Sequence, residues 1–237
     1  MAELDGRVRS AVVQYWFARL QQRNRQLADG KADQGERSAV TGGAQMNGFA
    51  DLLEHLAVVA GLPPGSVGRK RKAVLPGYFR PTKEWDVIVV RDGKLLAAIE
   101  LKSQIGPSFG NNFNNRTEEA LGSALDLWTA YREQAYQASP APFLGYLLMI
   151  EDCPASRSPV AAQEPYFPVF PEYREASYLQ RYELFCRKLL LERHYTAAAL
   201  LTSSREGGAR GEYANVAEDL NITRFARSLV AHLQAMG

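Results

Sequence analysis

The chain has 237 residues, of which 46% are hydrophobic and 10% aromatic, which excludes a disordered protein and predicts a sizeable core. A net charge of +2 does not by itself indicate a polyanionic partner, and no apolar run is long enough to cross a bilayer. The chain starts without the pattern of a secretory signal, and its two cysteines have no zinc or redox spacing. We expect a single soluble domain over residues 1–237, located in the cytoplasm.

Two amphipathic helices are predicted in an N-terminal helical part, about residues 1–62. Apolar residues recur at helical spacing from Asp5 to Gln26, and again on one side of a segment that contains Phe49 and Leu52. A Gly-rich polar stretch lies between the two patterns. The sequence "GLPPGSVG" then ends the second helix.

The periodicity changes in a core part of about residues 70–203. The segment Ala73–Phe79 is apolar but is broken by Pro76, so it is at best an edge strand. Two stronger strands, Trp85–Val90 and Leu95–Lys102, are separated by the turn "RDGK". Together the three segments predict a meander.

Helices and strands alternate in the remainder of the chain. A helix is predicted with Glu118 in its first turn, followed by a fully apolar strand over Phe143–Ile150, typical of the middle of a sheet. Ser177 and Gln180 form a capping box for another helix, "TAAALLT" suggests a further strand, and a C-terminal helix covers about residues 214–236. The fold class is therefore α/β (α+β), with a central mixed β-sheet flanked by helices.

The charge is distributed unevenly. From Arg69 to Lys83 the chain has six basic residues and no acidic one. A solvated loop and a surface that contacts phosphates explain the cluster "RKRK" equally well. The candidate DNA-contacting residues in this strip are Arg69, Lys70, Arg71, Lys72 and Lys83.

The candidate catalytic residues are Asp86, Glu100 and Lys102. Glu100 and Lys102 share a face of an extended strand, because alternate side chains point the same way. A plain two-residue turn at Asp92–Gly93 would leave Asp86 on the other face. Asp86 faces Glu100 only if the loop has an odd length, for example residues 92–94, or if the hairpin contains a bulge. We predict this register.

Two facing carboxylates repel each other unless a cation lies between them, and hard oxygen ligands suit Mg²⁺. The backbone carbonyl of Leu101 would be a further ligand. Such a metal would polarise a phosphodiester and lower the pKa of a bound water, while Lys102 would orient or deprotonate that water. Ordinary cross-strand surface pairs explain the same residues if the pattern is taken alone.

The order of these segments resembles a known catalytic fold. "PTKEWDVIVV" and "AAIELK" on a hairpin, then a helix and an apolar strand, resemble the PD-(D/E)xK nuclease core. One departure is that Pro81 lies five residues before Asp86 instead of adjoining it. A closer resemblance is to the XhoI-type type II restriction endonucleases, over about residues 10–195. It is carried by "QGERSAVTGGAQMNGF", "LPGYFRPTKEWDV", "ELKSQIGPSFGNNFNNRTEEALG", "EDC", "FPVFPEY" and "ASYLQRYELFCRKL".

The resemblance implies a homodimer that uses Mg²⁺ to cleave double-stranded DNA at the palindrome CTCGAG. It implies a cut after the first base with four-base 5′ overhangs, and a cognate DNA methyltransferase in the bacterial host. Carried over by position, it implies Asp86 and Glu100 as metal ligands and Lys102 as the catalytic lysine. Glu54 on the second helix is a further candidate acid, since several nucleases of this superfamily recruit a helix glutamate. Glu36 is a weaker one.

The stretch "FGNNFNNR" leaves the second strong strand soon after Lys102, and no acidic residue occurs from Ser103 to Arg116. An amide can bond an adenine edge and an arginine a guanine edge, so we predict a recognition loop. Asn115 fits a helix cap equally well, with Glu118 three residues on. The candidate DNA contacts here are Ser103, Gln104, Asn111, Asn112, Asn114, Asn115 and Arg116.

Two other classes of function fit the same fold. A DNA-binding protein could keep the fold without turnover, and a repair nuclease or junction resolvase would recognise DNA structure instead of sequence.

Overall fold

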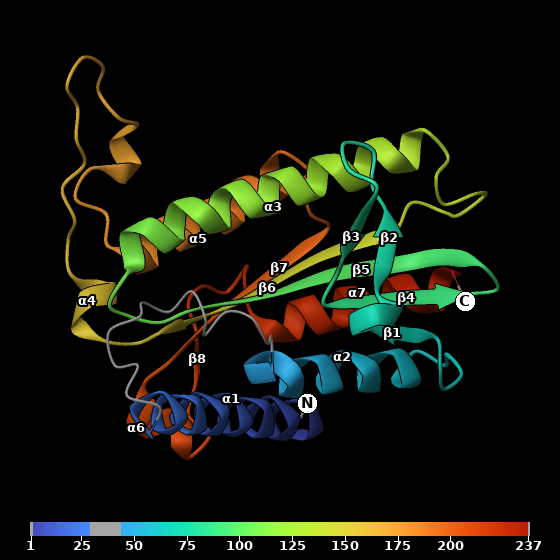
Figure 1. Cartoon of the computed structure of the whole chain (residues 1–237), viewed down its shortest axis with the longest axis horizontal. Coiled ribbons are helices and arrows are strands. Elements are labelled where there is room, and N and C mark those ends of the chain that lie inside the picture. The colour runs from blue at the N-terminus through green and yellow to red at the C-terminus, as the bar shows by residue number, and fades with distance from the viewer. Residues whose placement is uncertain (1, 29–43, 237) are drawn as a thin grey trace.

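A six-stranded mixed sheet forms the centre of the computed structural model, which describes residues 2–28 and 44–236 (Figure 1). Its strand order is β1-β4-β5-β6-β7-β8. β5, β6 and β7 run parallel, and the other neighbours are antiparallel. The bounds are β1 Val67–Arg69, β4 Val87–Arg91, β5 Lys94–Gln104, β6 Phe143–Glu151, β7 Ala197–Ser203 and β8 Ala214–Asn215.

Helices cover both faces of this sheet. Figure 1 shows α1 (Ala2–Ala28), α2 (Asn47–Val59) and α7 (Ile222–Met236) on one face, and α3 (Phe109–Arg132) and α5 (Tyr178–Leu191) on the other. Every residue of β6 is buried, as the unbroken apolar run predicts for a strand covered on both sides. The short elements are η1 Ala44–Met46, η2 Lys70–Lys72, α4 Pro154–Arg157, η3 Pro171–Tyr173 and α6 Arg205–Ala209. Within the described ranges, no helix is both long and apolar enough to cross a membrane.

The predicted fold class is confirmed, but the first strand of the meander is wrong. β2 (Val74–Pro76) pairs with β3 (Thr82–Glu84) in a separate two-stranded sheet. On the side away from β5, the neighbour of β4 is β1. β1 has only three residues, Val-Gly-Arg, too few to show the alternation that predicts a strand. Pro76 lacks an N–H, so a place in this small peripheral hairpin suits it better than one inside the main sheet.

The start of α3 is the largest difference from the sequence prediction. "FGNNFNNR" is not a loop: it forms the first two turns of this helix, which begins at Phe109 after Ser108. Asparagine is a weak helix former, but Phe109 stacks on Tyr178 with ring centroids 5.7 Å apart, and Phe113 meets Tyr182 edge to face at 5.0 Å. The apolar i, i+4 pair therefore overrides the propensity of the amides.

The other predicted helices and strands differ mainly at their ends. The capping box of Ser177 and Gln180 begins α5, and β6 and β7 lie where the sequence predicts strands. The C-terminal helix begins at Ile222, later than predicted, because Asn221 caps it: its side-chain oxygen accepts a hydrogen bond of 2.7 Å from the Arg224 N–H.

Candidate active site

A β-bulge sets the register of the β4–β5 hairpin. The turn is the two-residue type, with Asp92 and Gly93 both at positive φ (51° and 74°), as a type I′ turn requires. Val89 faces Ala97 but Val90 faces Leu95, so β5 holds one extra residue at Leu96. The bulge alternative of the sequence prediction is therefore the one that occurs.

The bulge brings the two candidate carboxylates to the same face. Val87 faces Ile99, so the residues that continue this register, Asp86 and Glu100, are opposite each other. Ala98 lies in the core under α3 and α5, and Glu100 shares its face because the two residues are two apart. Asp86 also accepts a hydrogen bond of 2.8 Å from the backbone N–H of Leu101, which fixes its side chain against β5.

Glu100 is buried, with an exposed fraction of 1%, between two lysines. Its carboxylate oxygens lie 2.6 Å from Lys83 Nζ and 3.6 Å from Lys102 Nζ. Neither oxygen accepts a well-directed hydrogen bond from the described residues, so charge is the main contact. Lys83 also lies over the Trp85 ring, 4.5 Å from its centroid. The buried anion is therefore compensated by cations, as it must be in a low-dielectric site.

Burial and charge act in opposite directions on the pKa values here. Burial outweighs the attraction of Lys102 and raises the pKa of Asp86. Burial opposes ionisation of Glu100 as well, but Lys102 and Lys83 together lower the pKa of Glu100. Burial opposes the charge on Lys102, yet Glu100, Asp86 and Glu119 raise its pKa. These neighbouring carboxylates thus favour the ammonium form of Lys102.

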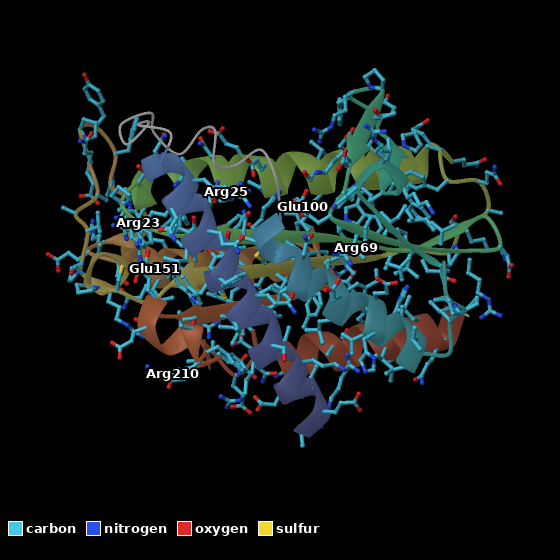
Figure 2. The ribbon with its side chains drawn as sticks, turned by 60° about the horizontal axis from the view of Figure 1, so that its bottom comes forward. Arg23, Arg25, Arg69, Glu100, Glu151 and Arg210 are labelled. Carbon is cyan, nitrogen blue, oxygen red and sulfur yellow. The ribbon has the colours of Figure 1, made fainter. Side chains whose placement is uncertain are left out.

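A cleft of about 340 Å³ opens beside this cluster. Figure 2 labels Glu100 on β5 and Arg69, which pairs with Asp51 of α2, in this region. The residues that line the cleft come from η1 and α2, from the segment that runs from β1 to the start of β4, from β5 and from α3. They are Gln45, Met46, Asn47, Ala50, Arg69, Lys70, Glu84, Trp85, Asp86, Leu101, Lys102, Ser103 and Arg116.

The donor set fits a hard divalent cation. Two carboxylates at one position of a hairpin and the carbonyl of Leu101 supply only oxygen atoms, which Mg²⁺ prefers. Lys83 lies 2.6 Å from one oxygen of the buried Glu100 carboxylate, so a divalent cation bound there would replace this lysine as the partner of that oxygen. In residues 2–28 and 44–236, no three His, Cys, Asp or Glu side chains lie close enough together to hold a metal ion, so no third acid joins Asp86 and Glu100 there.

Glu54, the first of the two candidate extra acids, does not line the cleft. Glu54 is 52% exposed on α2, lies outside the cleft lining, and is 3.5 Å from Arg69. Glu36 lies outside the described residues. Sequence reasoning missed two acids that are nearer: Glu84 lines the cleft, and Glu119 lies 3.8 Å from Lys102 Nζ. A helix that starts at Phe109 would have indicated Glu119, since it lies three residues beyond Arg116 on the same face.

The basic strip is divided between free and paired side chains. Lys70, Arg71 and Lys72 are exposed on η2. Arg69 pairs with Asp51 at 2.5 Å and with Glu54, so acids of α2 neutralise it. Lys83, predicted as a DNA contact, instead points at Glu100 with a side chain only 13% exposed, because the hairpin register brings that carboxylate to it.

The helical start of α3 divides the predicted recognition residues. Asn112 and Arg116 lie one turn apart and are partly buried, and Arg116 lines the cleft. Asn111, Asn114 and Asn115 are exposed, and Asn115 is not a cap because the helix starts six residues earlier.

Ser103 lines the cleft, although it is largely buried and accepts a hydrogen bond from Arg19. Gln104 is only 1% exposed, and its amide is bonded to Ile105 and Tyr182. We therefore remove Gln104 from the predicted DNA contacts: in this strand its side chain turns into the protein.

Comparison with known proteins decides the family. Residues 25–215 match the protein family described as "Restriction endonuclease XhoI". The chain belongs to this family of type II restriction endonucleases. Its relatives are therefore site-specific deoxyribonucleases, and the cleft of this family member is a candidate DNA-cleaving site.

Three curated relatives of the XhoI family are similar over most of their length. The chain is 55% identical to "Type II restriction enzyme BstVI" of Geobacillus stearothermophilus over 211 residues, which is 87% of this chain and 94% of the relative. It is 48% identical to "Type II restriction enzyme XhoI" of Xanthomonas vasicola, over 81% and 77% of the two chains. It is also 48% identical to "Type II restriction enzyme AbrI" of Azospirillum brasilense, over 70% and 75%. No solved structure matches the chain significantly.

Proposed function

We propose that this restriction endonuclease hydrolyses double-stranded DNA at the palindrome CTCGAG in the presence of Mg²⁺. It cuts after the first C of each strand and leaves four-base 5′ overhangs. The specificity is that implied by the XhoI family resemblance, and the 48% identity to a relative named XhoI supports it. The enzyme acts as a homodimer, since two copies related by a two-fold axis match the symmetry of a palindrome.

The observation that carries the catalytic proposal is the register of the β4–β5 hairpin. The bulge at Leu96 brings Asp86 and Glu100 together, and Lys102 lies 3.6 Å from Glu100. Without the extra residue, Asp86 would be on the face opposite Glu100. The fold therefore assembles two carboxylates and an ammonium group beside an open cleft, which an ordinary surface hairpin would not require.

Each of these residues has a separate role in the proposal. Asp86, Glu100 and the Leu101 carbonyl hold the metal, which supplies Lewis-acid activation of the phosphate and an acidified water. Lys102 keeps its positive charge and stabilises the negative charge that develops on the phosphate. Lys83 gives Glu100 a cation partner when no metal is bound. The exposed Lys70, Arg71 and Lys72 contact the DNA backbone, and Asn112 and Arg116 at the cleft contact base edges.

The cellular setting follows from the same proposal. A nuclease that cuts a six-base site would damage its own genome, so its host, a bacterium, needs a DNA methyltransferase that protects CTCGAG. The two enzymes would work in the cytoplasm on the same sequence without a direct contact.

Digestion of one long DNA of known sequence tests the proposed function. The expected result is a set of discrete fragments in Mg²⁺ and none in EDTA, with every end mapping to CTCGAG. Ends at another sequence would contradict the proposed specificity. A smear, or cuts only at branched or damaged DNA, would favour a structure-specific nuclease, and binding without any cutting would favour a non-catalytic DNA-binding protein.

A further inference from the structure

The tip of the β2–β3 hairpin presents two aromatic side chains to solvent. Tyr78 is 54% exposed and Phe79 is 65% exposed, and their rings meet edge to face with centroids 4.9 Å apart. Exposing large aromatic side chains to water is unfavourable, and burying them in a complex is favourable. A pair of them on a projecting element is therefore a common sign of a binding surface.

A buried acid holds this tip in one conformation. Asp126 on α3, whose side chain is only 4% exposed, accepts hydrogen bonds from the backbone N–H groups of Tyr78 and Phe79 at 2.7 and 2.8 Å. Its other oxygen pairs with Arg80 Nε at 2.7 Å. Pro76 is held as well, because its carbonyl accepts a bond from Tyr136. The exposed rings are therefore presented by a fixed backbone and not by a loose loop.

The hairpin connects directly to the catalytic site. Figure 1 shows it rising from the sheet across α3. Its first strand follows the exposed basic turn Lys70–Lys72, and its second strand leads through Glu84 and Trp85 into Asp86, which line the cleft. No acidic residue occurs from Arg69 to Lys83. The element thus joins an aromatic tip to a cation cluster through a stem whose one acid, Glu84, lies at its base beside the cleft, and the tip and cluster are complementary to a polyanion.

We propose that the β2–β3 hairpin contacts the DNA duplex beside the cut, with Tyr78 and Phe79 packed against a groove or between base steps. This inference rests on the proposed function in one respect, that Asp86 marks the scissile phosphate. Apolar side chains at such a position unstack or widen neighbouring base steps and thereby place the phosphate. The hairpin is in that case a positioning element rather than part of the chemistry.

The length of the chain limits where the contact can fall. Only seven residue steps separate Phe79 from Asp86, and an extended chain covers at most about 3.6 Å per step, roughly 25 Å in all. With on the order of 10 Å for side chains and the phosphate, and about 3.4 Å per base pair, the contact falls within about ten base pairs of the cut.

Photo-crosslinking tests the contact directly. Phe79→p-benzoylphenylalanine is mixed in EDTA with a duplex of about 40 base pairs that carries the sequence cut by the wild-type enzyme, as mapped from its own fragment ends. The expected crosslink joins the protein to DNA within about ten base pairs of the cut. Because the duplex is chosen from the measured cut, a wrong recognition sequence cannot be mistaken for failure of this inference.

A matched pair of variants gives a second measurement. Tyr78→Ala with Phe79→Ala should weaken binding to the same duplex in EDTA about tenfold and leave the unfolding midpoint within the range of the control. The control is Tyr166→Ala with Phe167→Ala, two even more exposed aromatics on another loop, which should bind like the wild type. A crosslink from Phe79 to a second protein chain, or equal losses in both variants, would overturn the inference.

Discussion

Glu119 contacts both Arg116, a proposed DNA contact, and Lys102, the proposed catalytic lysine. Its carboxylate is 2.6 Å from Arg116, which lines the cleft, and 3.8 Å from Lys102. Sequence patterns indicated the hairpin acids and Lys102, because strand alternation is local. They did not indicate Glu119, since its position depends on where α3 begins, and the packing of Phe109 and Phe113 decides that start.

Glu119→Gln should lower the single-turnover rate of cleavage, measured with saturating enzyme, about fivefold. The substitution removes one anion that holds Lys102 in place, and a partly exposed ion pair of this kind contributes about 1 kcal/mol. Glu118→Gln is the matched control, because it removes the same charge from the neighbouring, exposed position. Single-turnover cleavage measures the effect; equal rates for the two variants would contradict this role of Glu119.

Among the elements, the β4–β5 hairpin determines the site. The turn "RDGK" could be predicted from Asp92 and Gly93, and a need for an odd register could be stated from Asp86 and Glu100 alone. The sequence could not choose between an odd loop and a bulge, because Leu95, Leu96 and Ala97 are all apolar and all buried. Core packing on both faces makes that choice.

Gly93→Ala should destabilise the protein by about 1 kcal/mol, because φ is +74° at this position and a Cβ is strained there. Gly122→Ala, on α3 with no atom within 4 Å of the new Cβ, should instead stabilise it by a few tenths to about 1 kcal/mol. Urea denaturation with unchanged m-values measures both. If both substitutions changed the free energy of unfolding in the same direction, the positive φ of Gly93 would not be what the hairpin requires.

The β2–β3 hairpin should have an acid-sensitive anchor. Burial opposes ionisation of Asp126, but Arg80 and the N–H groups of Phe79 and Tyr78 lower its pKa below the usual 3.8. Stability from a lowered pKa is fully present above the unfolded value and is lost as the pH falls through the folded value. Asp126→Asn should therefore lower the free energy of unfolding by about 1–3 kcal/mol at pH 7. Urea denaturation at a series of pH values should show this difference from the wild type disappearing below about pH 4. A difference in unfolding free energy that does not change with pH would contradict the role of the Asp126 charge.

For the whole molecule, the distribution of charge matters more than its net value of +2. The acids of the first turn of α1, and Asp51 on α2, pair with nearby arginines, whereas η2 keeps three exposed basic residues beside the cleft. Lys70→Ala should weaken binding to every DNA sequence and reduce the salt slope by about 1. Lys94→Ala, at the far end of β5, should change neither. Salt titrations on specific and unrelated duplexes compare them, and a loss confined to the specific duplex would contradict a backbone contact.

The central claim is that Asp86, brought to Glu100 by the bulge, is required for cutting and not for binding. Asp86→Ala and Asp86→Asn are the variants, and the second keeps an acceptor for the Leu101 N–H. The measurement is cleavage in Mg²⁺ and duplex binding in EDTA on the same preparations. We predict that both variants lose cleavage by at least about a thousandfold while their affinity stays within about threefold of wild type. Cleavage at near wild-type rates by either variant would contradict the proposed site.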